Sequence, residues 1–298
     1  MEVENCTVFS CEKQVIVDAE ATQKLYEAEP LGKFAGFSNY TNRAHLAFDE
    51  VAILWSNSKG FFSFISGLSN FPFYKALGFT ITYTAIVTPM VIVLGFAIAV
   101  AVNTLSQRLK GPVIFFSLLP MIITPLIGSL ILFWMIDARG ILGASLQSLF
   151  DDPNLSLKAS ATLTWITLII YGIWHSAPFA FVVFYAGLQT VPQDTLESAM
   201  IDGATRWERV RYVIIPHLAP LVVFVGLIQL MDNFRVFEPV VGFNAQAHAT
   251  SLSWIIFNDM NADSKLLNSA ATTSMLTIVG VALLLTPVLI RTWRGFTR

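Results

Sequence analysis

Five long apolar runs constrain this chain more than any other feature, because a helix needs about 20 apolar residues to cross a lipid bilayer. The runs cover residues 76–102, 112–136, 161–188, 218–234 and 268–290. Only 13% of the 298 residues are charged, about half of the roughly 25% typical of a soluble domain. We therefore predict an all-α integral membrane protein with about five recognisable spans.

Prolines in two of these runs predict bends. Pro120 and Pro125 lie in the second run, and Pro178 is expected to interrupt the third. Residues 1–75 contain no run long enough to span, and their acidic start predicts no secretory signal peptide. Aromatic residues and glycines in 61–73 favour a helix at the outer membrane surface. The sequence thus divides into a polar segment at 1–75, a membrane domain at 76–290 and a tail at 291–298.

Basic residues beside the runs predict the orientation, since cytoplasmic loops carry an excess of positive charge. One side holds Arg108, Lys110, Arg206, Arg209, Arg211, Arg291, Arg294 and Arg298. The opposite loops hold fewer basic residues, diluted by nearby acids: Arg139, Lys158, Arg235 and Lys265. The first side, which includes the loop 189–217 and the C-terminus, is therefore predicted to be cytoplasmic. The segment 1–75 is predicted to lie outside.

The loop 189–217 is the most charged stretch between two long apolar runs, and apolar residues recur in it at helical spacing. Gly203 would cost about 1 kcal/mol in a helix interior relative to alanine, so it is predicted to mark a bend between two short helices. Asp194 and Thr195 are placed to cap the first helix, and Pro216 is expected to close the second. The sequence thus predicts a helix–bend–helix knob with an apolar ridge outside the membrane.

This loop resembles the cytoplasmic coupling loop of ABC importer permeases, which reads Glu-Ala-Ala-x-x-Asp-Gly-Ala followed at a fixed distance by Ile/Leu-Pro. The matching residues are Glu197, Ala199, Asp202, Gly203, Ala204 and Pro216, while Ser198 and Val210 depart from the pattern. In that family the loop docks into a cleft on the ATP-hydrolysing subunit, so the resemblance implies an ATPase-coupling role for these residues and Arg206. The alternative is an ordinary amphipathic loop between two spans. A structural role is expected for the two acids, either capping the second helix or pairing with Arg206 or Arg209.

Weaker resemblances point to the sugar-type branch of the family, which includes maltose and glycerol-phosphate importers. They involve residues 34–40, 138–144, Gly242 and 250–252. Residues 34–40 resemble the segment that follows the first membrane helix in sugar-type permeases, yet that first helix is not evident here. These resemblances favour the first of the two permeases in such an importer, in the bacterial cytoplasmic (inner) membrane.

The resemblance also implies partners: a second homologous permease, two copies of an ATP-binding subunit and an extracytoplasmic solute-binding protein. The chain has no G-x-x-x-x-G-K-[ST] motif, so it is predicted not to be an enzyme, and ATP and Mg are expected on the partner ATPase. Its net charge of -2 gives no reason to expect nucleic acid as a partner. The four histidines lack metal-ligand spacing, so we expect no metal site and no cofactor in this chain: His45, His175, His217 and His248.

Polar residues in the fourth run, Gln229, Asp232 and Asn233, point to a substrate pathway. Such groups are costly in a span unless they face a cavity or a partner, and Gln229 and Asn233 lie four residues apart on one helical face. Residues 232–234 resemble the stretch that lines the sugar pathway of maltose-type permeases. Amide groups suit a polyhydroxylated ligand, and aromatic rings could stack on it, namely Trp134, Tyr171 and Trp174. Hydrogen bonds between helices of two subunits are the alternative role for the polar residues.

The predicted function is a permease subunit of a binding-protein-dependent ABC importer for a carbohydrate or polyol. The alternative is an ion-coupled secondary transporter of a small solute. Such a transporter should have inverted repeats and ionisable residues at the centre of its spans. The span interiors here are almost free of Asp, Glu, Lys and Arg, and no internal repeat is evident. The sequence therefore favours the importer.

Overall fold

The computed structural model describes residues 2–7, 10–15, 36–58, 60–151, 156–158, 160–262 and 266–296. It divides into two units, Met1–Asn39 and Tyr40–Arg298. In the first unit, β1 (Glu2–Thr7) and β2 (Ser10–Val15) pair as an antiparallel hairpin that the sequence did not predict. The predicted roles of residues 16–35, of Lys265 and of the basic side chains in the tail 291–298 lie outside the described residues and side chains.

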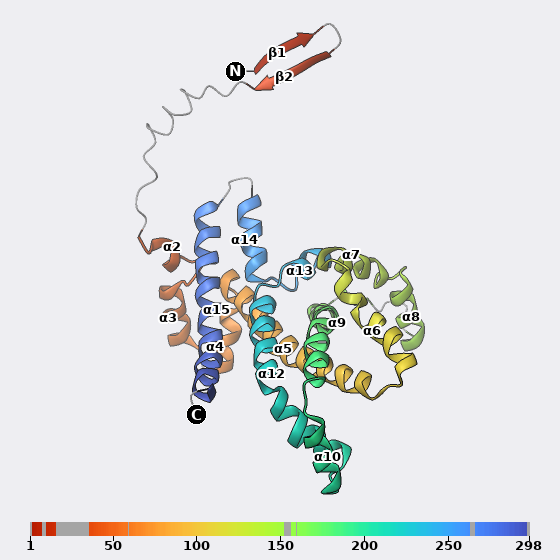
Figure 1. The fold of residues 1–298 in the computed structure, drawn as a ribbon. Helices are drawn as coiled ribbons and strands as arrows, with labels where there is room; N and C mark the ends of the chain where they lie inside the picture. The colour runs from red at the N-terminus through yellow and green to blue at the C-terminus, as the bar shows by residue number, and fades with distance from the viewer. Residues whose placement is uncertain are drawn as a thin grey trace. The chain divides into compact units, whose positions relative to one another are not determined.

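The second unit is built from helices, as predicted for an all-α membrane protein (Figure 1). The short α2 (Ser38–Thr41) crosses the boundary between the units. The helices that follow are α3 (Phe48–Asn57), α4 (Phe61–Leu68), α5 (Pro72–Thr104), α6 (Gln107–Ile122), α7 (Pro125–Met135), α8 (Ile141–Phe150), α9 (Ala161–Leu188), α10 (Gln193–Ile201), α11 (Arg206–Arg209), α12 (Ile215–Phe234), α13 (Glu238–Gly242), α14 (Leu252–Asn261) and α15 (Leu267–Phe296).

The predicted spans correspond to α5, the pair α6–α7, α9, α12 and α15. Among the described residues, four helices are long and apolar enough to cross a bilayer: α5, α9, α12 with the turns before it, and α15. The pair α6–α7 also qualifies if it forms one span bent by 95°. The predicted count of about five spans is therefore confirmed on length and composition.

The two proline predictions had opposite outcomes. The second span does bend, and the break falls at Ile123 and Thr124, which are both extended. Thr124 directly precedes Pro125, and a residue before proline avoids the α conformation. The predicted interruption at Pro178 is wrong, since α9 runs unbroken from Ala161 to Leu188 with Pro178 buried inside it. Neighbouring helices can support a membrane helix around the hydrogen bond that a proline removes.

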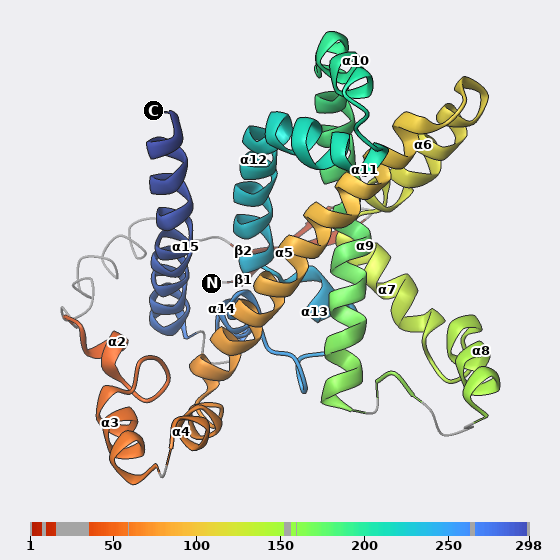
Figure 2. The same ribbon diagram turned by 90° about the horizontal axis from the view of Figure 1, so that it is seen from below.

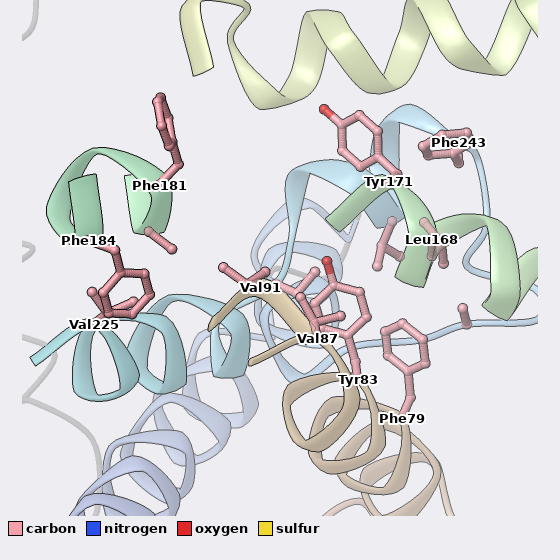
Figure 3. Packing of buried hydrophobic residues seen from close by; sticks show 14 of the residues in the cluster. Phe79, Tyr83, Val87, Val91, Leu168, Tyr171, Phe181, Phe184, Val225 and Phe243 are labelled. Carbon is pink, nitrogen blue, oxygen red and sulfur yellow. The ribbon is translucent and has the colours of Figure 1, made fainter. Parts of the chain in front are cut away.

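The core of the second unit lies where α5, α9 and α12 meet. Phe79, Tyr83, Val87 and Val91 follow one face of α5 at four-residue spacing, and they pack with buried side chains of α9 and α12 that include Leu168, Phe181, Phe184 and Val225 (Figure 3). Small residues let α5 and α9 approach closely, because a methyl group at Gly95 would overlap Ala180 and one at Gly172 would overlap the hydroxyl of Tyr83.

The long helices run between two ends of the second unit. Figure 2 shows α10 and the C-terminal end of α15 at one end, and α3, α4 and α8 at the other. The helices α5 and α15 both begin at the end that carries α3 and α4. The knob at α10 and the hairpin α3–α4 therefore lie at opposite ends of the spans.

Candidate functional site

A cavity of about 620 Å³ lies between the spans. Its walls come from α5, α6, α7, α9, α12, α13 and the start of α14, and they combine aromatic, amide and charged side chains. The lining residues include Tyr83, Pro125, Tyr171, His175, Ser176, Phe179, Gln229, Asp232, Asn233, Arg235 and Glu238. Three predicted pathway residues of α12 and the predicted Tyr171 are thus brought to one cavity.

Gln229 and Asn233 occupy neighbouring turns of α12, and each side chain is more than nine-tenths buried, with 4% and 5% exposed. The Asn233 Nδ2 amide donates to Thr88 Oγ1 at 3.0 Å and to Gln229 Oε1 at 3.4 Å. The bond to Thr88 joins α12 to α5 of the same chain, whereas the alternative role that the sequence left open was bonding between helices of two subunits. Within the described residues, Gln229 Nε2 and Asn233 Oδ1 have no hydrogen-bond partner although both side chains line the cavity.

Tyr171 and His175 of α9 form hydrogen bonds to backbone carbonyls at the break between α6 and α7. The Tyr171 hydroxyl donates to the carbonyl oxygen of Pro125 at 2.7 Å, and His175 Nε2 lies 3.2 Å from the carbonyl oxygen of Ile123. The carbonyl of Ile123 follows the last turn of α6 and lacks an intrahelical donor, so it needs a partner inside a membrane, whereas the Pro125 carbonyl accepts the Tyr171 hydroxyl in the first turn of α7. The two side chains therefore support the bend and line the cavity at the same place.

The other predicted aromatic residues lie elsewhere. Trp174 is not among the cavity-lining residues; its ring centre lies 6.1 Å from that of Tyr171. Trp134 is also outside the lining and is largely exposed. The aromatic residues that line the cavity are instead Tyr83, Tyr171, Phe179 and Phe237.

Charged residues gather on the cavity wall formed by the end of α12 and the start of α13. Asp232 and Arg235 form an ion pair at 3.5 Å, with more than half of each side chain exposed, and Glu238 lies at the start of α13. An ion pair this exposed contributes little to stability, at most about 1 kcal/mol. These groups are therefore better suited to shaping the charge of the wall than to holding the fold.

Sequence reasoning missed the polar stripe of α5. Thr80, Thr84 and Thr88 are buried at four-residue spacing, and Thr88 holds Asn233. Thr80 Oγ1 accepts from the backbone N–H of Leu252, at the start of α14. Three threonines at i, i+4 and i+8 in an otherwise apolar run were a readable signal, because polar groups in a span seek partners.

The knob contains the predicted bend. The helix α10 ends at Ile201, and Gly203 has a positive φ of +79° before α11 begins at Arg206. No atom lies within 4 Å of the point where a Cβ on Gly203 would be, so the backbone conformation alone requires glycine. The predicted helix–bend–helix arrangement is therefore confirmed.

Two capping predictions for the knob are wrong. The helix α10 begins at Gln193 after Pro192, so Asp194 and Thr195 lie inside its first turn and no side chain caps it. The second helix is capped by Thr205, which forms a reciprocal capping box with Glu208. The hydrogen bonds from the Thr205 side chain and backbone lower the pKa of the Glu208 carboxyl below its ordinary value.

The roles predicted for Glu197, Asp202 and Pro216 also differ from what the structure shows. Within the described residues, no ion pair joins Glu197 or Asp202 to an arginine. Pro216 does not close a helix, because a π turn at Val210–Ile214 leads directly into α12, in which Pro216 occupies the first turn. Proline has no backbone N–H, so in the first turn of α12 it leaves no donor unpaired. The N–H of the preceding residue, Ile215, donates to the carbonyl oxygen of Val210 in the wider π pattern.

The knob presents the predicted apolar ridge. Ile201 is 87% exposed and Trp207 is 68% exposed, and Met200 and Tyr212 of the same loop are also exposed. Arg206 and Arg209 lie on the same short helix, α11. Large apolar side chains gathered in this way on an exposed loop mark an interaction surface.

The family described as "Binding-protein-dependent transport system inner membrane component" matches residues 59–293 of this chain. The chain belongs to this family. It is therefore a permease subunit of a binding-protein-dependent ABC importer and a component of the inner membrane. Membership in this family does not favour the alternative prediction, an ion-coupled secondary transporter of a small solute.

Relatives of known name agree with this assignment. The chain is 26% identical over 241 residues to the probable ABC transporter permease protein y4oQ of Sinorhizobium fredii, covering 79% of this chain and 76% of that protein. It is 27% identical to the trehalose/maltose transport system permease protein MalF of Thermococcus litoralis (74% and 75%). It is also 27% identical to the sn-glycerol-3-phosphate transport system permease protein UgpA of Agrobacterium fabrum (77% and 79%).

A solved structure shows the same fold. A chain of a bacterial ABC transporter that imports the acidic polysaccharide alginate superposes with a TM-score of 0.67 at 19% identity. The match covers 84% of this chain and 90% of that chain. The predicted fold class, an ABC importer transmembrane domain, is confirmed.

Proposed function

We propose that this permease subunit carries a carbohydrate or polyol through the cavity that Gln229 and Asn233 line. The observation that carries the proposal is the pair of buried amide side chains whose Gln229 Nε2 and Asn233 Oδ1 lack partners within the described residues. Both residues line the cavity and neither free atom is sealed off from it, so a passing ligand with hydroxyl groups can pair with the Gln229 donor and the Asn233 acceptor. Relatives named as trehalose, maltose and glycerol-phosphate permeases support the same ligand class.

The size and lining of the cavity suit such a ligand. Its volume of about 620 Å³ lies within the roughly 300–1,000 Å³ of typical small-molecule sites. One donor and one acceptor from the amides can bind neighbouring hydroxyls, while Tyr83 and Phe179 offer ring faces to the apolar side of a sugar ring. The ion pair of Asp232 and Arg235 lies on the same wall and leaves no unpaired charge between those two residues.

The proposed assembly contains a second homologous permease, two ATP-binding subunits and an extracytoplasmic solute-binding protein. ATP and Mg reside on the ATP-binding subunits. The knob docks on one of these subunits from the cytoplasm, and its docking segment comprises Glu197, Ala199, Asp202, Gly203, Ala204, Arg206 and Pro216. The positive charge near the knob and in the C-terminal tail supports a cytoplasmic position for both.

The mechanism requires the spans to alternate between two states with different contacts. Closure of the ATP-binding subunits moves the knob, and α12 follows because the π turn joins α11 to α12 without a loop. Since Gln229 and Asn233 lie on α12, movement of the knob reaches the ligand-binding side chains through one helix. ATP hydrolysis on the partner thus changes access to the cavity.

The test is uptake by proteoliposomes that contain the full complex, ATP inside and the binding protein outside. Radiolabelled maltose, trehalose and sn-glycerol 3-phosphate serve as probes. Gln229→Leu should reduce uptake of the transported probe about tenfold, since the loss of one buried hydrogen bond to ligand costs about 1–1.5 kcal/mol. Met231→Leu is the matched control, because Met231 is exposed on the same helix and does not line the cavity.

Complex assembly and ATP hydrolysis without ligand should be unchanged in both variants. Unchanged uptake in Gln229→Leu would refute the pathway. Uptake that proceeds without ATP and follows an ion gradient would refute the importer mechanism.

A further inference from the structure

The helices α3 and α4 form a hairpin directly before the first span. The ring of Trp55 on α3 meets Phe64 on α4 edge to face, with centroids 4.9 Å apart. A Cβ on Gly67 would lie 2.6 Å from Leu54 Cδ1, so the two helices approach closely at this glycine. The hairpin therefore has its own internal packing, and it is not simply a connecting loop.

A buried histidine fastens the turn before this hairpin to the last span. His45 is 1% exposed; its Nδ1 lies 2.8 Å from Asn42 Oδ1, and its Nε2 lies 3.1 Å from Thr273 Oγ1 in the first turns of α15. The Tyr74 hydroxyl of α5 donates to the carbonyl oxygen of Leu46 at 2.7 Å. The turn at residues 42–47 is thus held to the starts of two spans.

The outward edge of α4 is apolar. Phe61, Phe62 and Ile65 are exposed, and Phe62 is 87% exposed, whereas Phe64 and Gly67 lie against α3 and Leu68 is partly buried. The helix carries no charged residue, and Lys59 is the one charged residue in the sequence from 51 to 74. The serines of α4, Ser63 and Ser66, are also exposed but follow a different edge at 100° per residue.

The position of α4 places this edge close to the start of α5. Only residues 69–71 separate the end of α4 from the start of α5, so the two helix ends lie within about 14 Å. Figure 2 shows α3 and α4 at the end of the molecule where α5 and α15 begin, opposite α10. The apolar edge of α4 therefore lies at the end of the second unit where two spans begin.

We propose that the α3–α4 hairpin is an interfacial membrane anchor, in which Phe61, Phe62 and Ile65 insert between the lipid headgroups at the end of the spans opposite the knob. Lipid suits this edge better than a soluble partner, because an uncharged edge with two adjacent phenylalanines would face water whenever such a partner left. This proposal does not depend on the carbohydrate assignment.

The test places one fluorescent label on each edge of α4. In a background of Cys6→Ser and Cys11→Ser, Phe62→Cys and Ser63→Cys are labelled with an environment-sensitive dye. The proteins are reconstituted in nanodiscs of phosphatidylethanolamine and phosphatidylglycerol, as the isolated subunit and as the full complex. Ser63 is the matched control, because it is exposed on the same helix one residue away.

In both preparations we expect the label at 62 to have blue-shifted emission and to lose intensity with doxyl-labelled lipid. The label at 63 should lose intensity mainly with aqueous iodide. Quenching of both labels by iodide alone would overturn the proposal. Protection of the label at 62 from both quenchers in the complex, with iodide access in the isolated subunit, would show that a protein covers this edge and would also overturn it.

Discussion

The bend at Gly203 gives the most quantitative prediction. Its φ of +79° lies in the left-handed region, where a residue with a Cβ costs about 1–2 kcal/mol. No atom lies within 4 Å of the Cβ position, so Gly203→Ala introduces no clash and acts on the backbone alone. Alanine therefore raises the free energy of the bent knob relative to conformers in which this residue relaxes to negative φ.

The population of the docking-competent knob falls accordingly. A change of about 1–2 kcal/mol corresponds to a factor of roughly 5–30, which is the largest loss of affinity for the ATP-binding subunit that Gly203→Ala can cause. Gly203→Asn should lose much less affinity, because asparagine visits the left-handed region more readily. Gly111→Ala is the control for adding a methyl group, since the Cβ site of Gly111 is also empty and its φ is not in the left-handed region.

The assay is a titration of the purified ATP-binding subunit against the permease complex in nanodiscs, read as a dissociation constant by interferometry. The reasoning predicts weakened binding for Gly203→Ala, near-normal binding for Gly203→Asn and unchanged binding for Gly111→Ala. Equal affinities for wild type and Gly203→Ala would show that the bend does not limit docking. Equal losses for the alanine and asparagine variants would show that the side chain, not the backbone conformation, is responsible.

Two further predictions concern stability. Gly172→Ala should destabilise the protein by about 1–3 kcal/mol, because its methyl group would overlap the hydroxyl of Tyr83. Gly226→Ala is the control, because its methyl group would meet its nearest neighbour at an ordinary 3.7 Å. Thermal unfolding in detergent compares the two variants, and equal midpoints would contradict close α5–α9 packing. Because the pKa of Glu208 is lowered from 4.5 in the folded knob, its stabilisation of α11 is present above that pH and lost as pH falls through the lowered value. Hydrogen exchange at residues 206–209, corrected for intrinsic rates, should therefore rise at acid pH in wild type, and a pH profile identical to that of Glu208→Gln would argue against the capping box.

Hydropathy was sufficient to find the spans, because helix length and composition are imposed by the bilayer itself. The bend before Pro125 was predictable for a similarly local reason, since proline constrains the residue that precedes it. Pro178 and Pro216 were not predictable in this way. Whether a proline ends a helix depends on what neighbouring helices and turns supply, and here α9 continues through Pro178 while a π turn carries the chain into α12.

Part of the cavity lining could be predicted from the sequence. The spacing of Gln229 and Asn233 placed both on one face of a span, and the structure brings them to the same cavity. Their partner Thr88 lies 145 residues away from Asn233, so no local pattern could pair them. The capping box at Thr205 is a local pattern, a threonine followed three residues later by Glu208, whereas the sequence prediction assigned the cap of the second helix to the acids of the family motif.

Co-purification tests the central claim most directly. The tagged chain is extracted from native membranes in mild detergent, and its partners are identified by mass spectrometry for wild type and for Ile201→Asp, which places a charge on the exposed ridge of the knob. The account predicts that wild type retains an ATP-binding subunit and a second permease, and that Ile201→Asp loses the ATP-binding subunit while keeping the permease. A wild-type chain that purifies alone and still moves solute without ATP would contradict it.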